Sequence, residues 1–229
     1  MKLAIMQPYF LPYIGYFQLM RAADLFVYYD DVTFIKQSWI NRNRILLDNR
    51  EHLFTLELEG ASSFRSINSI SIGNNRSRLM KTFVQAYRKA PYFRDFEPVL
   101  HSVFSSTETG LADYIAETHR SVLEYLGVEA KSVRSSSIGK DNSLKGQDKV
   151  IDICKRMGAV EYINAPGGRG LYSYNDFSDN GIKLSFLQPA EIRYRQFGND
   201  FIPWLSIIDI IMFNSVAQVN QILDNYTLE

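Results

Sequence analysis

The amino-acid sequence predicts an α/β fold: an open, mostly parallel, Rossmann-like sheet with a β-hairpin insertion and a helical part. Short apolar segments typical of buried strands alternate with amphipathic helical segments at the start of the chain and again in its second half. The chain has 229 residues, which is enough for one substantial core. We therefore expect a single α/β domain over residues 1–229, with a helical lobe at 75–127.

The N-terminal elements form a βαβ unit of the kind that begins nucleotidyltransferase folds. Residues 2–6 are a short apolar run that predicts a buried strand, and residues 11–24 carry apolar side chains at helical spacing. Residues 25–31 form a second apolar strand. Because such a crossover returns the chain to the same sheet, the two strands are expected to be neighbours and parallel.

The middle of the chain changes from strand to helix. The alternating segments 38–47 and 52–60 flank a turn at Asp48-Asn49 and predict a β-hairpin, with 67–73 as a third strand. Amphipathic helices are predicted at 75–90, 96–106 and 110–127.

The alternation of strands and helices returns in the second half and completes the sheet. Strands are predicted at 128–136, 160–165 and 182–188. Helices are predicted at 144–158, 204–214 and 216–226.

Composition and charge exclude several classes of protein. The 25 Lys and Arg balance 25 Asp and Glu, which argues against a protein that works mainly by binding DNA, RNA or an anionic membrane. One cysteine cannot form a disulfide within the chain, and no segment approaches the roughly 20 apolar residues that span a bilayer. The start of the chain does not read as a signal peptide. We expect a cytoplasmic protein.

The candidate site lies where the predicted strands end, because ligands of open parallel sheets bind beyond the carboxyl ends of the strands. Gln7, Pro8 and Tyr9 follow the first strand, and Asp30 and Asp31 follow the second. These residues are expected to converge on one edge of the sheet.

A Tyr-Ile-Gly-Tyr sequence begins the first predicted helix. Nucleotidyltransferases of this fold place a His-x-Gly-His signature there, but Tyr13 and Tyr16 occupy both imidazole positions. A phenol with an ordinary pKa of about 10 does not supply a cation at neutral pH, so this chemistry is disfavoured. The two rings are either ligand contacts or core residues.

Two arginines give the clearest chemical signal. Side chains alternate along a strand, so Arg42 and Arg44 share one face while Asn41 and Asn43 share the other. Adjacent guanidinium groups repel each other unless an anion lies between them, either a ligand phosphate or carboxylate or a carboxylate of the chain. The alternative is a solvated strand edge.

Three residues are candidates for catalysis, namely Asp30, Asp31 and Lys36. The carboxylates suit a base, a hydroxyl acceptor or a Mg²⁺ ligand, or else they belong to a turn, and they are also the expected partners of the arginine pair. Lys36 adds a phosphate donor, and Trp39 adds a ring for a base or sugar face.

A glycine-rich sequence follows the 160–165 strand. Gly167 and Gly168 would let backbone amides approach an anion or a sugar, with Tyr172 beside them, although the sequence lacks the features of a P-loop. The three histidines show no metal-ligand spacing, and His119 is interpreted as structural. We therefore assign no metal site.

Three segments resemble a known family in order and spacing: the first 45 residues from Gln7 onward, APGGRGLY at 165–172, and YRQFGNDFIPWLSIIDIIMFN at 194–214. They are similar to the WbqC-like proteins of bacterial surface-polysaccharide gene clusters. This resemblance implies a role in O-antigen or related glycan biosynthesis. It also implies substrate-binding roles for Tyr194, Gln196, Ser206 and Asp209, with the terminal segment folded back onto the site; alternatively Ser206 and Asp209 cap a helix.

The implied reaction is attachment of an acyl or aminoacyl group, such as glycyl, to the amine of a dTDP- or UDP-linked sugar. The acyl donor decides the class of enzyme: a free acid with ATP and Mg²⁺ gives an amide ligase, and a thioester or aminoacyl-tRNA gives a transferase, although neutral charge does not favour tRNA. A nucleotidyltransferase-like enzyme and a non-catalytic nucleotide-sugar-binding protein are the alternatives.

Overall fold

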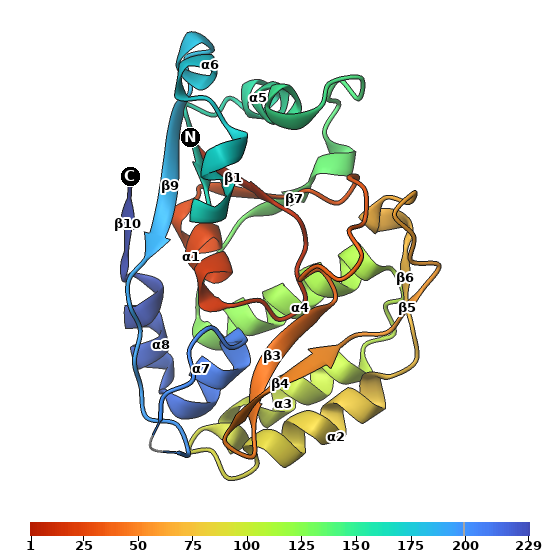
Figure 1. Cartoon of the computed structure of the whole chain (residues 1–229), viewed down its shortest axis with the longest axis vertical. Coiled ribbons are helices and arrows are strands. Elements are labelled where there is room, and N and C mark those ends of the chain that lie inside the picture. Colours follow the sequence, from red (N-terminus) through yellow and green to blue (C-terminus); the bar gives the residue numbers. More distant parts are fainter. Residues whose placement is uncertain (199) are drawn as a thin grey trace.

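The computed structural model describes residues 1–198 and 200–229 and contains the predicted open sheet. Its six strands have the order β10-β9-β8-β1-β2-β7, and all neighbours are parallel except β9 and β10 (Figure 1). The strands are β1 (Lys2–Met6), β2 (Leu25–Tyr28), β7 (Ser132–Arg134), β8 (Glu161–Asn164), β9 (Lys183–Pro189) and β10 (Tyr226–Leu228). Since β1 pairs with β2 on one side and β8 on the other, the strand order reverses at β1.

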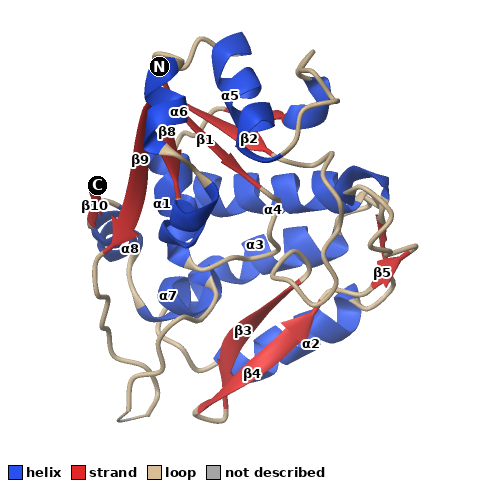
Figure 2. Cartoon of the chain, turned by 45° about the horizontal axis from the view of Figure 1, so that its top comes forward, coloured by secondary structure: helices blue, strands red, loops and turns tan. Residues whose placement is uncertain are grey.

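The predicted helices are present, and they cover both faces of the sheet (Figure 2). They are α1 (Ile14–Ala22), α2 (Arg76–Tyr87), α3 (Phe93–Ser105), α4 (Leu111–Leu126), α5 (Gly146–Arg156), α7 (Ile207–Phe213) and α8 (Val216–Leu223). The short helix α6 (Tyr174–Asp179) and strand β10 had no predicted counterpart. None of the helices in the two described ranges combines the length and the apolar character that a membrane crossing needs.

The insertion is a hairpin of β3 (Arg42–Leu47) and β4 (Arg50–Thr55). Asp48 and Asn49 form the turn with φ of 51° and 57°, the left-handed pair that a tight two-residue hairpin uses. The third strand expected at 67–73 does not join this hairpin. That segment forms a 3₁₀ turn and then β6 (Ser71–Ile72), which pairs with β5 (Leu58–Glu59) as a separate ribbon.

Successive residues of β1 divide the core between the two faces of the sheet. Leu3 and Ile5 pack in a cluster with residues of α5 and α6, whereas Ala4 belongs to a larger cluster with α1 and α4. The larger cluster also contains buried side chains of α2, α3, α7, α8 and the hairpin. The helical part at 75–127 therefore shares one core with the sheet.

A buried carboxylate ties the C-terminal segment to this core. Asp209 on α7 accepts hydrogen bonds from Tyr87 Oη (2.8 Å), Tyr194 Oη (2.6 Å) and Gln196 Nε2 (2.7 Å). Tyr87 also accepts a hydrogen bond from the Leu46 amide of β3. Burial raises the pKa of Asp209, and the hydrogen bonds oppose that rise.

We predict that Asp209→Asn lowers the free energy of unfolding by about 2–3 kcal/mol, because the amide would meet three donors with only one acceptor oxygen. Urea unfolding measures this loss. The matched control is Asp224→Asn, which removes the charge of a carboxylate whose side chain is 60% exposed beside Arg21, and it should cost less than about 1 kcal/mol. Equal losses in the two variants would contradict the role of the buried carboxylate.

Candidate functional site

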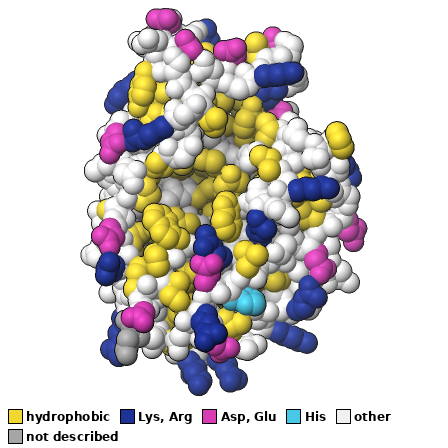
Figure 3. Space-filling view, in the orientation of Figure 1, with side chains coloured by type: hydrophobic (Ala, Val, Ile, Leu, Met, Phe, Trp, Pro, Cys, Tyr) yellow, Lys and Arg dark blue, Asp and Glu magenta, His cyan; other side chains and the backbone are white. Residues whose placement is uncertain are grey.

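A cavity of about 500 Å³ lies at the carboxyl ends of β1, β8 and β9, beside the start of α1. This is the reversal point of the strand order, where ligands of open α/β sheets bind. Figure 3 shows hydrophobic side chains gathered round a hollow on this face. Five predicted site residues line the cavity: Tyr9, Tyr13, Tyr16, Trp39 and Arg44.

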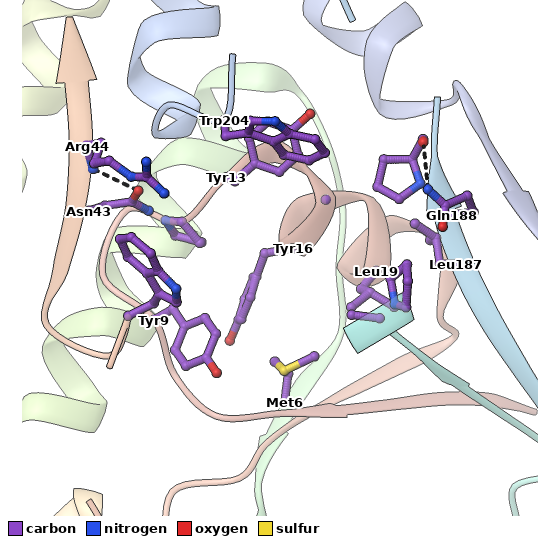
Figure 4. Close-up of a pocket in the computed structure, with 16 residues that line it drawn as sticks. Met6, Tyr9, Tyr13, Tyr16, Leu19, Asn43, Arg44, Leu187, Gln188 and Trp204 are labelled. Atoms are coloured by element: carbon purple, nitrogen blue, oxygen red, sulfur yellow. Dashed lines mark hydrogen bonds between the residues drawn. The ribbon is translucent and has the colours of Figure 1, made fainter. Parts of the chain in front are cut away.

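Five aromatic side chains line the cavity: Tyr9, Tyr13, Tyr16, Trp39 and Trp204 (Figure 4). The rings of Tyr9 and Tyr16 lie 5.8 Å apart, and those of Tyr13 and Trp204 lie 5.2 Å apart. Burial raises the pKa of Tyr9, Tyr13 and Tyr16, so their phenols are neutral hydrogen-bonding groups. Tyr16 is 6% exposed and serves as a core ring as well as a wall residue.

The loop from residue 7 to residue 13, called here the β1–α1 loop, is held by its backbone carbonyls. Ser206 Oγ donates to the Leu11 carbonyl at 2.7 Å, and Asn43 Nδ2 donates to the same oxygen at 3.0 Å. The Ile207 amide donates to the Pro12 carbonyl at 2.8 Å. The terminal segment therefore folds back onto this loop, and Ser206 also caps α7 by accepting from the Ile208 amide.

His119 on α4 holds the same loop from the core side. Its Nε2 lies 2.7 Å from the Tyr9 carbonyl, which only accepts, so Nε2 carries the proton. Its Nδ1 therefore accepts from Tyr28 Oη at 3.1 Å. Burial lowers the pKa of His119 to about 4, with the Tyr9 hydrogen bond opposing, so the ring is neutral.

Backbone strain gathers near the cavity. Leu11, Gln37 and Trp204 have φ of 46°, 61° and 61°, a conformation that side chains with a Cβ rarely adopt. Leu11 belongs to the β1–α1 loop, Gln37 lies two residues before Trp39, and Trp204 lines the wall. Strained residues of this kind persist where the surrounding contacts enforce them, often at functional sites.

The arginine pair flanks Trp39. The guanidinium carbon of Arg44 lies 4.9 Å from the centre of the Trp39 ring, and that of Arg42 lies 5.8 Å from it. Arg44 pairs with Glu51 at 2.7 Å, and Arg42 donates to the backbone carbonyls of Ser38 and Gln37. The carboxylate that faces Arg44 is thus Glu51 of the adjacent strand, in place of the expected Asp30 or Asp31.

Asp30 and Asp31 lie at the ends of β2 and β7, outside the lining of the cavity. Asp30 is buried and accepts from the Ser136 amide (2.9 Å) and the Ser136 hydroxyl (2.6 Å). Asp31 accepts from Ser135 Oγ at 2.5 Å and pairs with the buried Lys140. Burial alone would raise the pKa of Asp31, but the hydrogen bonds from Lys140 and Ser135 outweigh it and lower the pKa.

The remaining predicted residues do not line the cavity. Lys36 is exposed, Asn41 donates to the Leu56 carbonyl, and Pro8 is buried. The Gln7 carbonyl accepts from Tyr16 Oη, which fixes the start of the β1–α1 loop. Tyr194, Gln196 and Asp209 form the buried network below the terminal segment.

The glycine-rich sequence forms a 3₁₀ turn, Pro166–Leu171, beside the cavity. Gly168 is buried, and a Cβ there would lie 2.5 Å from the Asn164 side chain, so close packing accounts for this glycine. Tyr172 packs against Tyr162 and Phe177 in the cluster on the opposite face of the sheet.

Sequence reasoning missed Asn43, Trp204 and the end of β9 as lining residues. The alternation that identified Arg42 and Arg44 placed Asn43 on the opposite strand face, but no pattern indicated that Asn43 would hold Leu11. Trp204 had a sequence signal, because it is one of only two tryptophans in the chain and lies in the last of the segments that resemble the family.

We predict that the free energy of unfolding depends on pH through the protonation of His119. The folded pKa of about 4 lies below the ordinary value of about 6.5, so the unfolded chain binds the proton first and stability falls as the pH drops from 7 to 5. Glutamine keeps a side-chain donor but does not titrate. Between pH 7 and pH 5 the free energy of unfolding of His119→Gln, measured in urea, should therefore fall by about 2 kcal/mol less than that of the wild type. His101→Gln, at an exposed histidine of α3, is the control and should leave the loss unchanged. An equal loss in wild type and His119→Gln would contradict the assignment of a buried neutral ring.

Comparisons with known proteins identify the family of the chain. The model of the WbqC-like protein family matches residues 7–221, which include the β1–α1 loop, the hairpin and the terminal segment. The chain is also 25% identical over 222 residues to a Mycobacterium tuberculosis protein named "Uncharacterized protein Rv1507c", with 95% of each chain covered. No solved structure shows a significant match. The chain belongs to the WbqC-like protein family.

Proposed function

We propose that the protein is a biosynthetic enzyme that binds a nucleotide-linked amino sugar in the cavity and transfers an acyl or aminoacyl group to the sugar amine. Family membership supports a biosynthetic role, and the resemblance noted in the sequence supports surface-glycan chemistry. The cavity supports a ligand with a flat ring and an anionic group, because aromatic side chains and one guanidinium share its wall.

The observation that carries the proposal is the state of Arg44. Its Nε atom is buried, and among residues 1–198 and 200–229 it has no hydrogen-bond partner. A buried donor without an acceptor is costly, and Arg44 lines the cavity, so a small shift of its guanidinium toward a phosphate oxygen there would supply a charge-assisted hydrogen bond. Glu51 neutralises only one of the two guanidinium groups beside Trp39, which leaves the site favourable for an anion.

The proposed chemistry is attack of the neutral sugar amine on an acyl carbonyl. The new C–N bond forms as the bond to the leaving group breaks, and the amine proton passes to a base. This reaction needs a positioned amine and hydrogen-bond donors for the oxyanion, with no protein nucleophile. Asp31 is our candidate base, because its side chain is 20% exposed while Asp30 is buried, and its lowered pKa makes it a weak one.

A second candidate function is a non-catalytic nucleotide-sugar-binding protein. Asp30 and Asp31 interact with Ser135, Ser136 and Lys140, and these contacts favour the binding protein. They give both carboxylates a structural role, which is to hold the end of β2 against the end of β7. A nucleotidyltransferase is less well supported, since the neutral phenols of Tyr13 and Tyr16 stand where that chemistry uses cations.

We predict that Arg44→Ala weakens the binding of UDP by about 1.5–3 kcal/mol, the contribution of a charge-assisted hydrogen bond. Both tryptophans of the chain line the cavity, so their fluorescence reports binding directly. Arg50→Ala, at an exposed arginine of the same hairpin, should bind UDP like the wild type. Equal affinity of wild type and Arg44→Ala would refute the phosphate role of Arg44.

We predict that Asp31→Asn retains binding of an amino-sugar nucleotide but forms at most about 1% of the acylated product, as expected for loss of a general base. Product is measured by mass spectrometry with acetyl-CoA, or with glycine, ATP and Mg²⁺, as donors. An Asp31→Asn protein that is fully active would exclude this base. Wild type that binds the nucleotide sugar yet forms no product with either donor would favour the binding protein.

A further inference from the structure

A second cavity, of about 670 Å³, adjoins the first. The two share four residues, Tyr13, Gln188, Pro189 and Trp204, so these side chains form a partition between them. The outer walls of the second cavity come from the segments 190–193 and 200–203. The two cavities are therefore adjacent, separated by these four side chains.

Trp204 is the exposed aromatic residue of this partition. Its side chain has 62% exposure, and its ring lies 5.2 Å from that of Tyr13 at an angle of 49° (Figure 4). The backbone of Trp204 has a φ of 61°, which is strained for a bulky residue. Burial does not account for an indole that is mostly exposed and held by a strained backbone, whereas contact with a ligand does.

The two cavities differ in chemistry. The first has an aromatic wall and the cation of Arg44, whereas the second carries the carboxylates of Glu191 and Asp200 together with Arg193. Arg193 pairs with Glu191 at 2.8 Å, which leaves the second cavity with an excess negative charge. Phosphates are therefore favoured beside Arg44, and an ammonium group is favoured in the second cavity, where the Trp204 ring face also attracts a cation.

We propose that the second cavity holds the sugar of the nucleotide-linked amino sugar, with the ring against Trp204 and the ammonium group near Glu191 and Asp200. The nucleotide and its phosphates then occupy the first cavity beside Arg44. This inference rests on the proposed function and names the part of the site that selects an amine-bearing sugar. The acceptor nitrogen consequently lies on the outer side of the partition, open to an acyl donor, and in this position Glu191 and Asp200 take the place of Asp31 as the carboxylates within reach of it.

The test compares three probes, UDP, UDP-glucose and UDP-glucosamine, by isothermal titration calorimetry at pH 6. Wild type should bind UDP-glucosamine about threefold or more tightly than UDP-glucose, as expected from two exposed charge pairs. The double variant Glu191→Gln/Asp200→Asn should lose this preference and bind UDP within about twofold of wild type. The control Glu59→Gln/Asp179→Asn removes two exposed carboxylates outside both cavities and should keep the preference.

Failure of the inference and failure of the proposed function give different results. If wild type binds UDP but shows no preference for the amine, or if the double variant keeps the preference, the second cavity does not select the amino sugar. If wild type does not bind UDP or either sugar nucleotide, the proposed function itself is wrong. Circular dichroism of each variant verifies that these exposed substitutions leave the fold intact.

Discussion

The site depends on the hydrogen bonds that hold the backbone carbonyls of the β1–α1 loop. This loop contains two prolines and a leucine with φ of 46°, so it does not form a regular element by itself. Side chains from α1, α4, the hairpin and the terminal segment each donate to one of its carbonyls. The loop is therefore held by the adjacent helix α1 and by three distant parts of the chain, and that assembly positions the rings of Tyr9 and Tyr13.

Much of the fold could be predicted from the sequence because its signals are local. The apolar runs at β1 and β8, the Asp48-Asn49 turn and Gly127 after α4 each determine structure through neighbouring residues. Strand β10 could not be predicted, because its three residues gain their structure from antiparallel pairing with β9. The segment 67–73 was expected to add a strand to the hairpin, but its residues Ser71–Ile72 pair with Leu58–Glu59 as a separate ribbon, because strand pairing is a long-range choice.

The location of the site in the fold could be predicted better than the contacts that its side chains make. The rule for open sheets placed Tyr9, Tyr13 and Tyr16 at the edge where β1 ends, and all three line the cavity there. Alternation put Arg42 and Arg44 on one strand face but did not indicate that Arg44 would lie beside these tyrosines. The partners of the charges were not predictable: Arg44 faces Glu51 through the hairpin register, and Asp31 faces Lys140 across β2 and β7. The zero net charge of the chain is thus the sum of several local ion pairs. Only the geometry of the cavity shows that Arg44 is the cation beside the space for a ligand.

A crystal structure of the protein with UDP-glucosamine would show directly where the nucleotide and the sugar bind. We expect a diphosphate oxygen within hydrogen-bond distance of Arg44 Nε, with the sugar on the far side of Tyr13 and Trp204. A ligand bound instead against Asp31 and Lys140, with the aromatic cavity empty, would contradict it.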